Sequence, residues 1–233
     1  MKDINEMTAE QLIDYMDNGA FYDSAKKSDV KHAMGILKKY ADKGKADAQY
    51  KLGQLYNSPK EKGYAQKWYA KAIAAYESDI DTANNEILLK VAHAYLFGEG
   101  VERNTGRALE LYTKVADSGD GRGHKGIAYC YSCYGTPDAE KEKYWKELAI
   151  EAFRKRAEEG NALAQCEYGF MLHQSKDRKN EAAKWYELSA QQGYIKGIQK
   201  LIFCYEHGEG GVSVDMDKAK EWTEKLKAIK KNR

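Results

Sequence analysis

A nine-residue phrase that ends in glycine recurs along the chain, and this repetition limits the possible folds more than any other feature. It occupies residues 111–119, 152–160 and 185–193, and a degenerate copy occupies residues 36–44. A second phrase lies between the copies and is centred on a landmark position, usually a small residue: Gly53, Ala92, Ala128, Gly169 and Ile202. The landmarks are 39, 36, 41 and 33 residues apart. Periods in this range, with two helix-like phrases in each, are typical of a solenoid of stacked helix pairs.

Helical signals also occur before the first clear repeat. Thr8 and Gln11 form the pattern of a capping box ahead of an apolar run, which predicts a short helix that ends near Gly19. A second helix is predicted to end at Gly44. We expect these two helices to close one end of the solenoid, because a terminal repeat needs a polar outer face.

The sequence therefore predicts an all-α fold, a right-handed α/α superhelix of about five two-helix repeats. We expect a single repeat domain over residues 1–233, with a degenerate capping unit at 1–44, repeats at 45–227 and a basic tail at 228–233. The chain has only two prolines, which favours long helices without interruption.

Two loops carry the most specific pattern. Gly-Glu-Gly-Val at 98–101 recurs as Gly-Glu-Gly-Gly-Val at 208–212, and Lys218, Ala219 and Trp222 follow the second copy. Over about residues 45–227 the chain resembles the Sel-one-like repeats, a branch of the tetratricopeptide-like superfamily. The resemblance implies a helical solenoid that binds other proteins, and bacterial relatives of this size include regulators and proteins that neutralise toxic effectors. The third unit, which begins near Gly123, departs most from the family pattern.

Charge and composition argue against some partners. The net charge is +2, from 38 basic and 36 acidic residues, so nucleic acid is not expected as the main partner. The lysine-rich end, 218–233, is expected to be a solvated last helix, with nucleic-acid binding as the alternative. No apolar run is as long as a membrane span. The start of the chain and four cysteines without a pairing rhythm suggest a cytoplasmic protein, unless a leader segment has been removed.

Several short motifs have the residue pattern of a cofactor, metal or catalytic site but lack the rest of its sequence context. The Gly-x-Gly-x-x-Gly at 121–126 lacks a preceding strand, and Cys130-x-x-Cys133 has no second pair of ligands in sequence. Ser-x-x-Lys occurs at 24–27 and 28–31 without the other elements of a β-lactamase. We therefore expect no catalytic residue, no cofactor and no metal.

One set of positions suggests a binding site as well as a structural role. In tetratricopeptide-like arrays the first helix of each pair lines the concave face, so the residue after each landmark and the residue three before it should point inward. The residues after the landmarks are Gln54, His93, Tyr129, Phe170 and Phe203. The residues three before them are Tyr50, Leu89, Lys125, Cys166 and Gln199. Aromatic residues at neighbouring inward positions indicate either a groove for a partner or a tightly closed core.

The most consistent functional hypothesis is a scaffold or adaptor that binds another protein or peptide in its concave groove, as a bacterial regulator or an effector-neutralising protein does. The alternative from another class is a secreted hydrolase of cell-wall or β-lactam substrates. The partner and the oligomeric state do not follow from the sequence.

Overall fold

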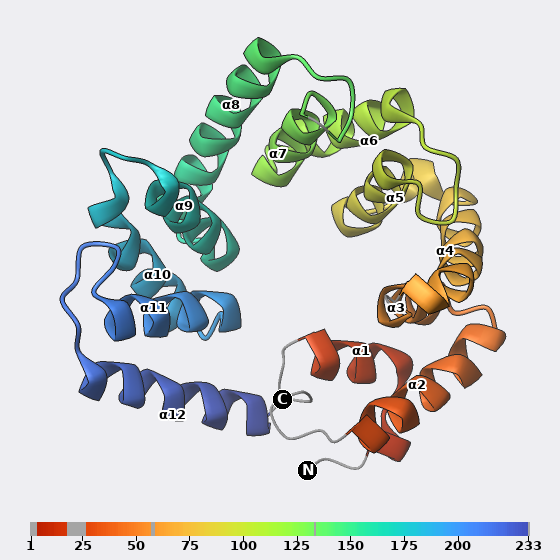
Figure 1. Ribbon diagram of the computed structural model, residues 1–233, viewed down its shortest axis with the longest axis horizontal. Coiled ribbons are helices and arrows are strands. Elements are labelled where there is room, and N and C mark those ends of the chain that lie inside the picture. The colour runs from red at the N-terminus through yellow and green to blue at the C-terminus, as the bar shows by residue number, and fades with distance from the viewer. Residues whose placement is uncertain (1–3, 18–26, 57–58, 133, 233) are drawn as a thin grey trace. The chain divides into compact units, whose positions relative to one another are not determined.

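The protein is all-helical. The computed structural model describes residues 4–17, 27–56, 59–132 and 134–232, and over these ranges it contains α-helices and short 3-10 helices without a β-strand (Figure 1). The predicted all-α fold is thereby confirmed. The chain forms two compact units, Met1–Lys146 and Glu147–Arg233.

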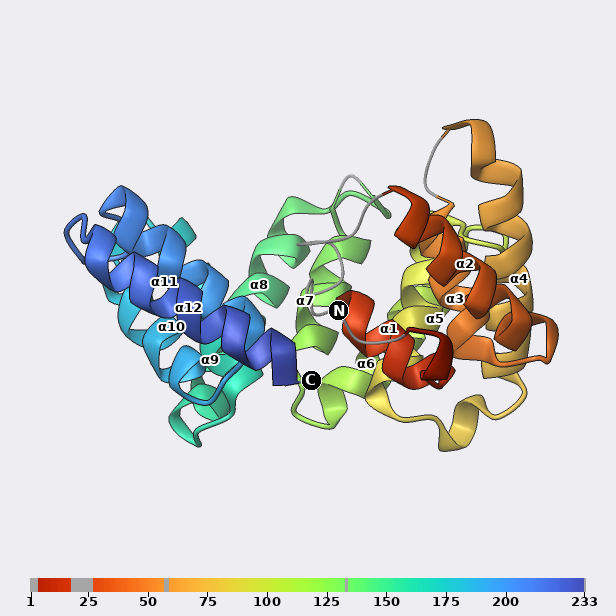
Figure 2. The same cartoon turned by 90° about the horizontal axis from the view of Figure 1, so that it is seen from below.

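In the first unit, each helix packs against its neighbours in the chain (Figure 1 and Figure 2). Its α-helices are α1 (Ala9–Asp17), α2 (Lys27–Asp42), α3 (Ala46–Leu55), α4 (Lys62–Glu77), α5 (Asn85–Phe97), α6 (Thr105–Asp117) and α7 (Gly121–Cys130). Its 3-10 helices are η1 (Ile4–Glu6), η2 (Pro59–Glu61) and η3 (Ile80–Thr82). Helix α8 (Ala139–Glu158) begins in this unit and continues into the second.

The second unit continues the same pattern of consecutive helix contacts, with α9 on α10, α10 on α11 and α11 on α12. Its further helices are α9 (Ala162–Gln174), η4 (Lys179–Glu181), α10 (Ala182–Gln191), α11 (Ile195–His207) and α12 (Met216–Asn232).

Helix boundaries follow the repeated residues. The closing glycines predicted from the sequence all adopt positive φ angles, from 75° at Gly193 to 90° at Gly160, which an L-residue with a side chain adopts only at a cost. Several helices begin with a side chain that caps the free backbone N–H groups. The caps that accept such a hydrogen bond include Asn84, Asn104, Asp120 and Asn161.

The predicted capping box at the start of α1 is also present. The Thr8 N–H donates to Gln11 Oε1 at 2.9 Å, and the Gln11 N–H donates to Thr8 Oγ1 at 3.2 Å. The predicted end of this helix near Gly19 lies outside the described residues.

Each unit has its own apolar core. In the first unit one cluster joins α1 and α2 to α3 and α4 around Leu12, Leu37 and Trp68, and another runs from α3 to α7 around Val91 and Leu111. In the second unit one cluster joins the end of α8 to α9, α10, α11 and α12. Within each unit, neighbouring helices therefore bury their apolar stripes against one another, as a solenoid requires.

The landmark glycines allow the two helices of a repeat to approach closely. A Cβ atom placed on Gly53 would lie 2.7 Å from Cδ1 of Tyr69, and one on Gly169 would lie 2.9 Å from Cε1 of Tyr186. Both distances are too short for a real contact, so these positions need glycine for packing, as the repeat pattern predicted.

The Gly-Glu-Gly loops are interhelical turns that bind the preceding repeat. The Gly100 N–H donates to Gln66 Oε1 on α4 at 2.5 Å. The Gly210 carbonyl oxygen accepts a hydrogen bond from the Ala183 N–H at the start of α10, at 3.0 Å. The prediction that these loops are interhelical turns is confirmed.

The Gly-x-Gly-x-x-Gly motif at 121–126 forms the first turns of α7, and a helix, α6, precedes it. This excludes the strand-turn-helix context that a dinucleotide site needs. The insertion after α7 is a lengthened turn, in which the Thr136 N–H donates to the Cys130 carbonyl oxygen at 2.8 Å.

The Cys-x-x-Cys and Ser-x-x-Lys motifs lie partly outside the described residues. Cys130 is buried, whereas Cys133 and Ser24 lie outside the described residues. Over the described ranges, no three His, Cys, Asp or Glu side chains gather as a metal site would require. The same part of the chain contains no helix that is both long and apolar enough to cross a membrane.

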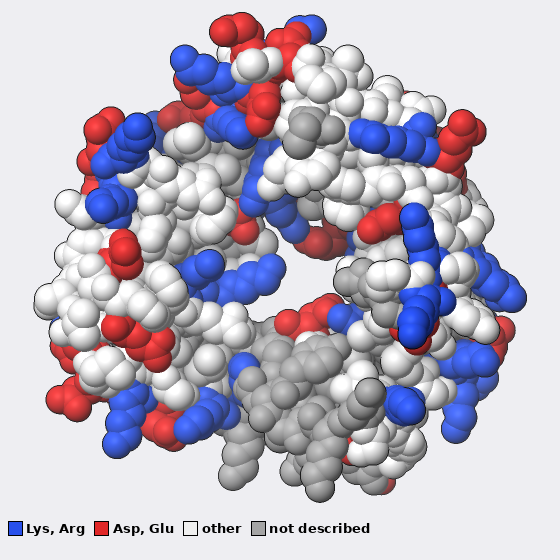
Figure 3. Space-filling view, in the orientation of Figure 1, with Lys and Arg blue, Asp and Glu red and all other residues white. Residues whose placement is uncertain are grey.

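The lysine-rich end is a helix in which two lysines form ion pairs with acids of the preceding turn. On α12, Lys225 pairs with Glu221 at 2.6 Å and Lys227 with Glu224 at 2.8 Å. Figure 3 shows Lys and Arg intermixed with Asp and Glu on the visible surface. The expected last helix is present, but only part of its surface is solvated, because Ala219, Leu226 and Lys230 are buried.

Candidate functional site

The first unit contains a pocket of about 460 Å³ between α5, α6 and α7. We call it the α5–α7 groove. It is lined by Leu89, His93, Phe97, Tyr112, Arg122, Lys125, Gly126, Tyr129 and Tyr134.

Helical spacing explains the two walls of the α5–α7 groove. Leu89, His93 and Phe97 are four residues apart on α5 and therefore share one face of that helix. On α7, Arg122, Lys125 and Tyr129 are three and four residues apart and share a face in the same way. The groove is thus formed by two first helices of successive repeats.

The floor of the α5–α7 groove depends on a glycine. Tyr112 on α6 is buried, with 4% of its surface exposed, and burial raises the pKa of its hydroxyl. A Cβ atom on Gly126 would collide with the Tyr112 ring. Gly126 therefore lets α7 approach α6 closely while the Tyr112 ring forms the floor.

The rim of the α5–α7 groove is a cluster of exposed rings. The centroids of His93 and Phe97 are 4.4 Å apart, those of Phe97 and Tyr134 are 5.4 Å apart, and those of Tyr129 and Tyr134 are 6.4 Å apart. The exposed fraction is 39% for Phe97, 39% for Tyr129 and 49% for Tyr134. These rings contact one another across the mouth, yet each keeps a large face open to solvent.

A carboxylate holds the imidazole at this rim. Glu99, from the Gly-Glu-Gly loop, lies with its Oε2 3.0 Å from His93 Nδ1. The loop that fixes the repeat to α4 therefore also orients a ring of the groove.

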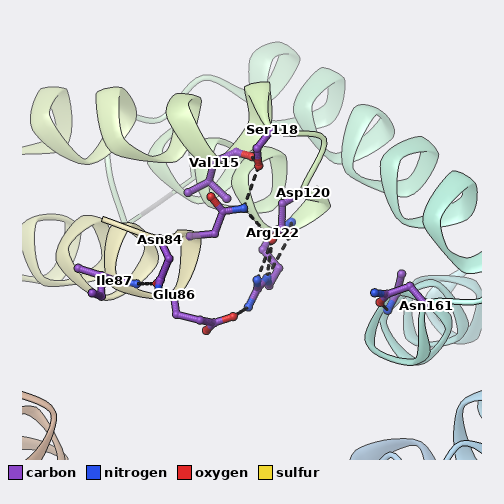
Figure 4. Close-up of polar contacts among 10 residues, drawn as sticks. Asn84, Glu86, Ile87, Val115, Ser118, Asp120, Arg122 and Asn161 are labelled. Carbon is purple, nitrogen blue, oxygen red and sulfur yellow. Dashed lines mark hydrogen bonds and ion pairs between the residues drawn. The ribbon is translucent and has the colours of Figure 1, made fainter. Parts of the chain in front are cut away.

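The polar wall of the α5–α7 groove is built around Arg122 (Figure 4). Its Nη2 lies 2.7 Å from Asp120 Oδ2, and its Nη1 lies 2.5 Å from Glu86 Oε1 on α5. Asn85 Nδ2 donates to Ser118 Oγ at 2.8 Å and to Asp120 Oδ2 at 3.4 Å. Burial acts to raise the pKa of the Asp120 carboxyl, but the hydrogen bonds from Arg122 outweigh it and hold that pKa below its usual value.

The second unit has exposed rings of its own. Phe203 on α11 is 45% exposed and stacks on His207, with 4.3 Å between their centroids. His173 on α9 lies 6.4 Å from Phe203 by ring centroids. Phe170 is half-buried and has the Lys200 ammonium 5.2 Å from its ring centroid, and Gln199 is exposed.

The structure brings together four of the predicted residues. Leu89, His93, Lys125 and Tyr129 all line the α5–α7 groove, and Gln54 is exposed on α3 outside it. The continuous row predicted from Tyr129 through Phe170 to Phe203 extends over both units and stays a prediction.

Two predicted positions need correction. Tyr50 is 7% exposed, because the rings of Tyr69 and Tyr76 cover it at centroid distances of 5.2 and 6.3 Å. Cys166 is 4% exposed within the core of the second unit. Neither side chain is available to a partner at the surface.

Sequence reasoning missed three accessible groove residues. Phe97 and Arg122 could have been found, because they are four residues after His93 and three before Lys125 on the same faces. Tyr134 follows α7 in the insertion, where no periodicity predicts its position.

Comparisons with known proteins place the chain in a family. An F-box protein from Arabidopsis thaliana is 31% identical over 124 residues, which are 52% of this chain and 33% of that protein. This chain thus spans about a third of the length of that relative.

Two solved structures are similar. An immunity protein from Pseudomonas aeruginosa is 17% identical, with a TM-score of 0.54 over 95% of this chain and 82% of that one. A protective antigen of uropathogenic Escherichia coli with an SLR fold is 24% identical, with a TM-score of 0.46 over 94% of this chain and 53% of that one. Because the immunity protein is only 17% identical to this chain, its similarity supports the fold alone.

The model of the Sel1 repeat matches residues 46–76, 88–120, 162–194 and 203–227, which together are more than half of the chain. The unmatched stretch 121–161 contains the third unit, where the sequence departs most from the pattern. The chain therefore belongs to the Sel1 repeat family.

Proposed function

We propose that this protein is a binding scaffold that holds a segment of another protein in the α5–α7 groove. Sel1 repeat proteins are in general protein-interaction scaffolds, and this is the class to which the chain belongs. The observation that carries the proposal is the cluster of Phe97, Tyr129 and Tyr134, which are 39%, 39% and 49% exposed around one pocket.

Exposed rings around a concave surface are typical of a binding site. Large apolar side chains scattered singly on a surface need no explanation, whereas a contiguous group around a pocket does. Aromatic side chains are also enriched among the residues that dominate binding energy. A partner side chain inserted between α5 and α7 would bury faces of these rings that now contact solvent.

A separate observation also supports binding rather than catalysis. Two of the charged or ionisable side chains that line the α5–α7 groove are paired with carboxylates, His93 with Glu99 and Arg122 with Asp120. The Ser28 hydroxyl, from one of the β-lactamase-like motifs, donates to its neighbour Asp29 at 3.3 Å. Effector neutralisation is one form that such binding takes, and it would use the same groove.

Capture from native lysate with matched variants tests the proposal. The bait is the full chain, the test variant is Phe97→Ala with Tyr129→Ala, and the control is Tyr64→Ala, because Tyr64 is 63% exposed on α4 outside the groove. We expect proteins that the unchanged chain and the Tyr64 variant retain but the double variant loses. Circular dichroism must show all three baits folded. Equal retention by the three would refute the proposal.

A further inference from the structure

The accessible charges that line the α5–α7 groove are cationic. Arg122 and Lys125 line it from α7, whereas the carboxylates next to it, Asp120, Glu86 and Glu99, are each paired with Arg122 or His93. A basic partner side chain could not replace Glu86 on Arg122, because it would place a like charge beside the guanidinium, which is unfavourable. An acidic one would enter next to the opposite charge.

Arg122 is positioned before any partner arrives. Its guanidinium contacts both carboxylate oxygens of Asp120, with Nε at 3.1 Å from Oδ1 and Nη2 at 2.7 Å from Oδ2. Asp120 itself is 4% exposed and also caps α7 by accepting from the Arg122 N–H at 3.0 Å. This buried carboxylate fixes the plane of the guanidinium and leaves Nη1 directed elsewhere.

Nη1 is occupied by a carboxylate that is easily replaced. Its partner is Glu86, whose side chain is 65% exposed, against 25% for Arg122. Exposed ion pairs contribute little to stability, because water competes for both charges and a long side chain must be held in one position. Glu86 therefore occupies a place that a carboxylate delivered by a bound partner can take.

We propose that the α5–α7 groove selects a protein segment in which an aromatic or aliphatic anchor is flanked by an aspartate or glutamate. The anchor packs among Phe97, Tyr129 and Tyr134, and the acidic side chain replaces Glu86 on Arg122 Nη1. This inference rests on the proposed function and adds the chemistry of the partner. Glu86 then acts as an internal competitor that weakens binding of acidic segments.

Selection from a random peptide library tests the inference without knowledge of the natural partner. Phage that display random 12-residue peptides are selected on the full chain and depleted on the Phe97→Ala, Tyr129→Ala variant, so that only groove-dependent peptides remain. We expect these peptides to combine an aromatic or aliphatic residue with Asp or Glu. Recovery of no groove-dependent peptide would overturn the proposed function together with this inference. Groove-dependent peptides that carry no acidic residue, or carry Lys or Arg instead, would overturn the inference alone.

Two point variants then assign the acidic residue to Arg122. The selected peptide and its amide analogue, with Asp→Asn or Glu→Gln, are titrated by fluorescence anisotropy. On the unchanged chain we expect the amide analogue to bind about tenfold more weakly, since hydrogen bonds to charged groups are the stronger ones. Arg122→Gln should remove this difference between the two peptides.

Glu86→Gln provides the independent test, because Glu86 is exposed and its replacement keeps the ion pair between Arg122 and Asp120. We expect this variant to bind the acidic peptide more tightly and the amide analogue as before. If Arg122→Gln weakens both peptides equally, or Glu86→Gln leaves the acidic peptide unchanged, Arg122 does not receive the acidic residue and the inference is wrong.

Discussion

The imidazole of His93 packs on the ring of Phe97 one turn later on α5, with 4.4 Å between their centroids. Helix α11 has the same two ring types in the opposite order, since Phe203 stacks on His207 at 4.3 Å. Each pair is followed directly by a glycine with a left-handed backbone conformation, Gly98 or Gly208, which begins a Gly-Glu-Gly loop. These two copies of the repeat therefore present an imidazole and a phenyl ring at equivalent exposed positions.

Adjacent residues on α5 should separate binding from folding. Leu96 is fully buried, whereas Phe97 is 39% exposed at the rim of the α5–α7 groove. We expect Leu96→Ala to lower the free energy of unfolding by about 2–5 kcal/mol, through lost burial and a residual cavity. Phe97→Ala should lower it by about 1 kcal/mol or less, as exposed substitutions do. Urea denaturation followed by circular dichroism measures both. A loss at Phe97 as large as that at Leu96 would mean that the rim belongs to the core.

The repeats and helix ends could be predicted because they depend on local residue chemistry. The closing glycines adopt the left-handed backbone that their positions require, and the capping box at Thr8 forms as its spacing indicates. The groove face of α5 could be predicted for the same reason, since His93 and Leu89 share a helical face.

The burial of Tyr50 and Cys166 could not be predicted from spacing alone. The landmark residue of each repeat faces the second helix of that repeat. Around the helix axis, the position three residues before the landmark is only about 60° from it, whereas the position directly after the landmark is about 100° from it. Such a border position is exposed or buried according to its neighbours. At Tyr50 the neighbours are the large rings of Tyr69 and Tyr76, whereas Leu89 and Lys125 are only partly covered. Tyr134 depends on the path of an irregular turn, which has no period to read.

Two glycines in different surroundings should respond oppositely to alanine. Gly35 lies within α2 with no atom within 4 Å of an added Cβ, while an added Cβ at Gly53 would lie 2.7 Å from the Tyr69 ring. We expect Gly35→Ala to raise the free energy of unfolding by about 0.5–1 kcal/mol, because alanine is the better helix former. Gly53→Ala should lower it by about 1–3 kcal/mol through overpacking. Thermal and urea unfolding of both variants test this, and a stabilised Gly53→Ala would show that α3 and α4 can separate at no cost.

Acid should destabilise the first unit through His124. Its ring lies 5.9 Å from that of Trp145 by centroids, and its Nδ1 is buried without a hydrogen-bond partner. Burial lowers the pKa of His124 below its ordinary value of 6.5, partly opposed by the charge of Asp117 and by the backbone and charge of Asp120. The unfolded chain therefore binds the proton more readily than the folded one. Stability is fully present above pH 6.5 and falls as the pH drops from there towards the folded pKa.

Nuclear magnetic resonance and unfolding experiments measure this effect together. The ring resonances of His124, assigned by their loss in His124→Gln, should titrate with a midpoint below 6.5. The decrease in unfolding free energy between neutral and mildly acidic pH should be smaller in His124→Gln than in the unchanged chain. A midpoint above the ordinary value would contradict the assignment, since a neighbouring carboxylate would then dominate over burial.

Buried thiols should remain unreactive until the chain unfolds. Burial raises the pKa of the Cys130 thiol to about 12 and that of Cys204 to about 11, the latter with a further contribution from the charge of Glu209. The thiolate is the reactive form, so both side chains should resist thiol–disulfide exchange at neutral pH in the folded protein. In a Cys133→Ser background, we expect a thiol reagent such as 5,5′-dithiobis(2-nitrobenzoic acid) to react slowly in buffer and rapidly in urea. Mass spectrometry of peptides that contain Cys130 and Cys204 identifies the modified positions. Rapid modification of Cys130 without denaturant would show that the end of α7 opens in the native state, and the Tyr129 side of the α5–α7 groove would then be mobile rather than preformed.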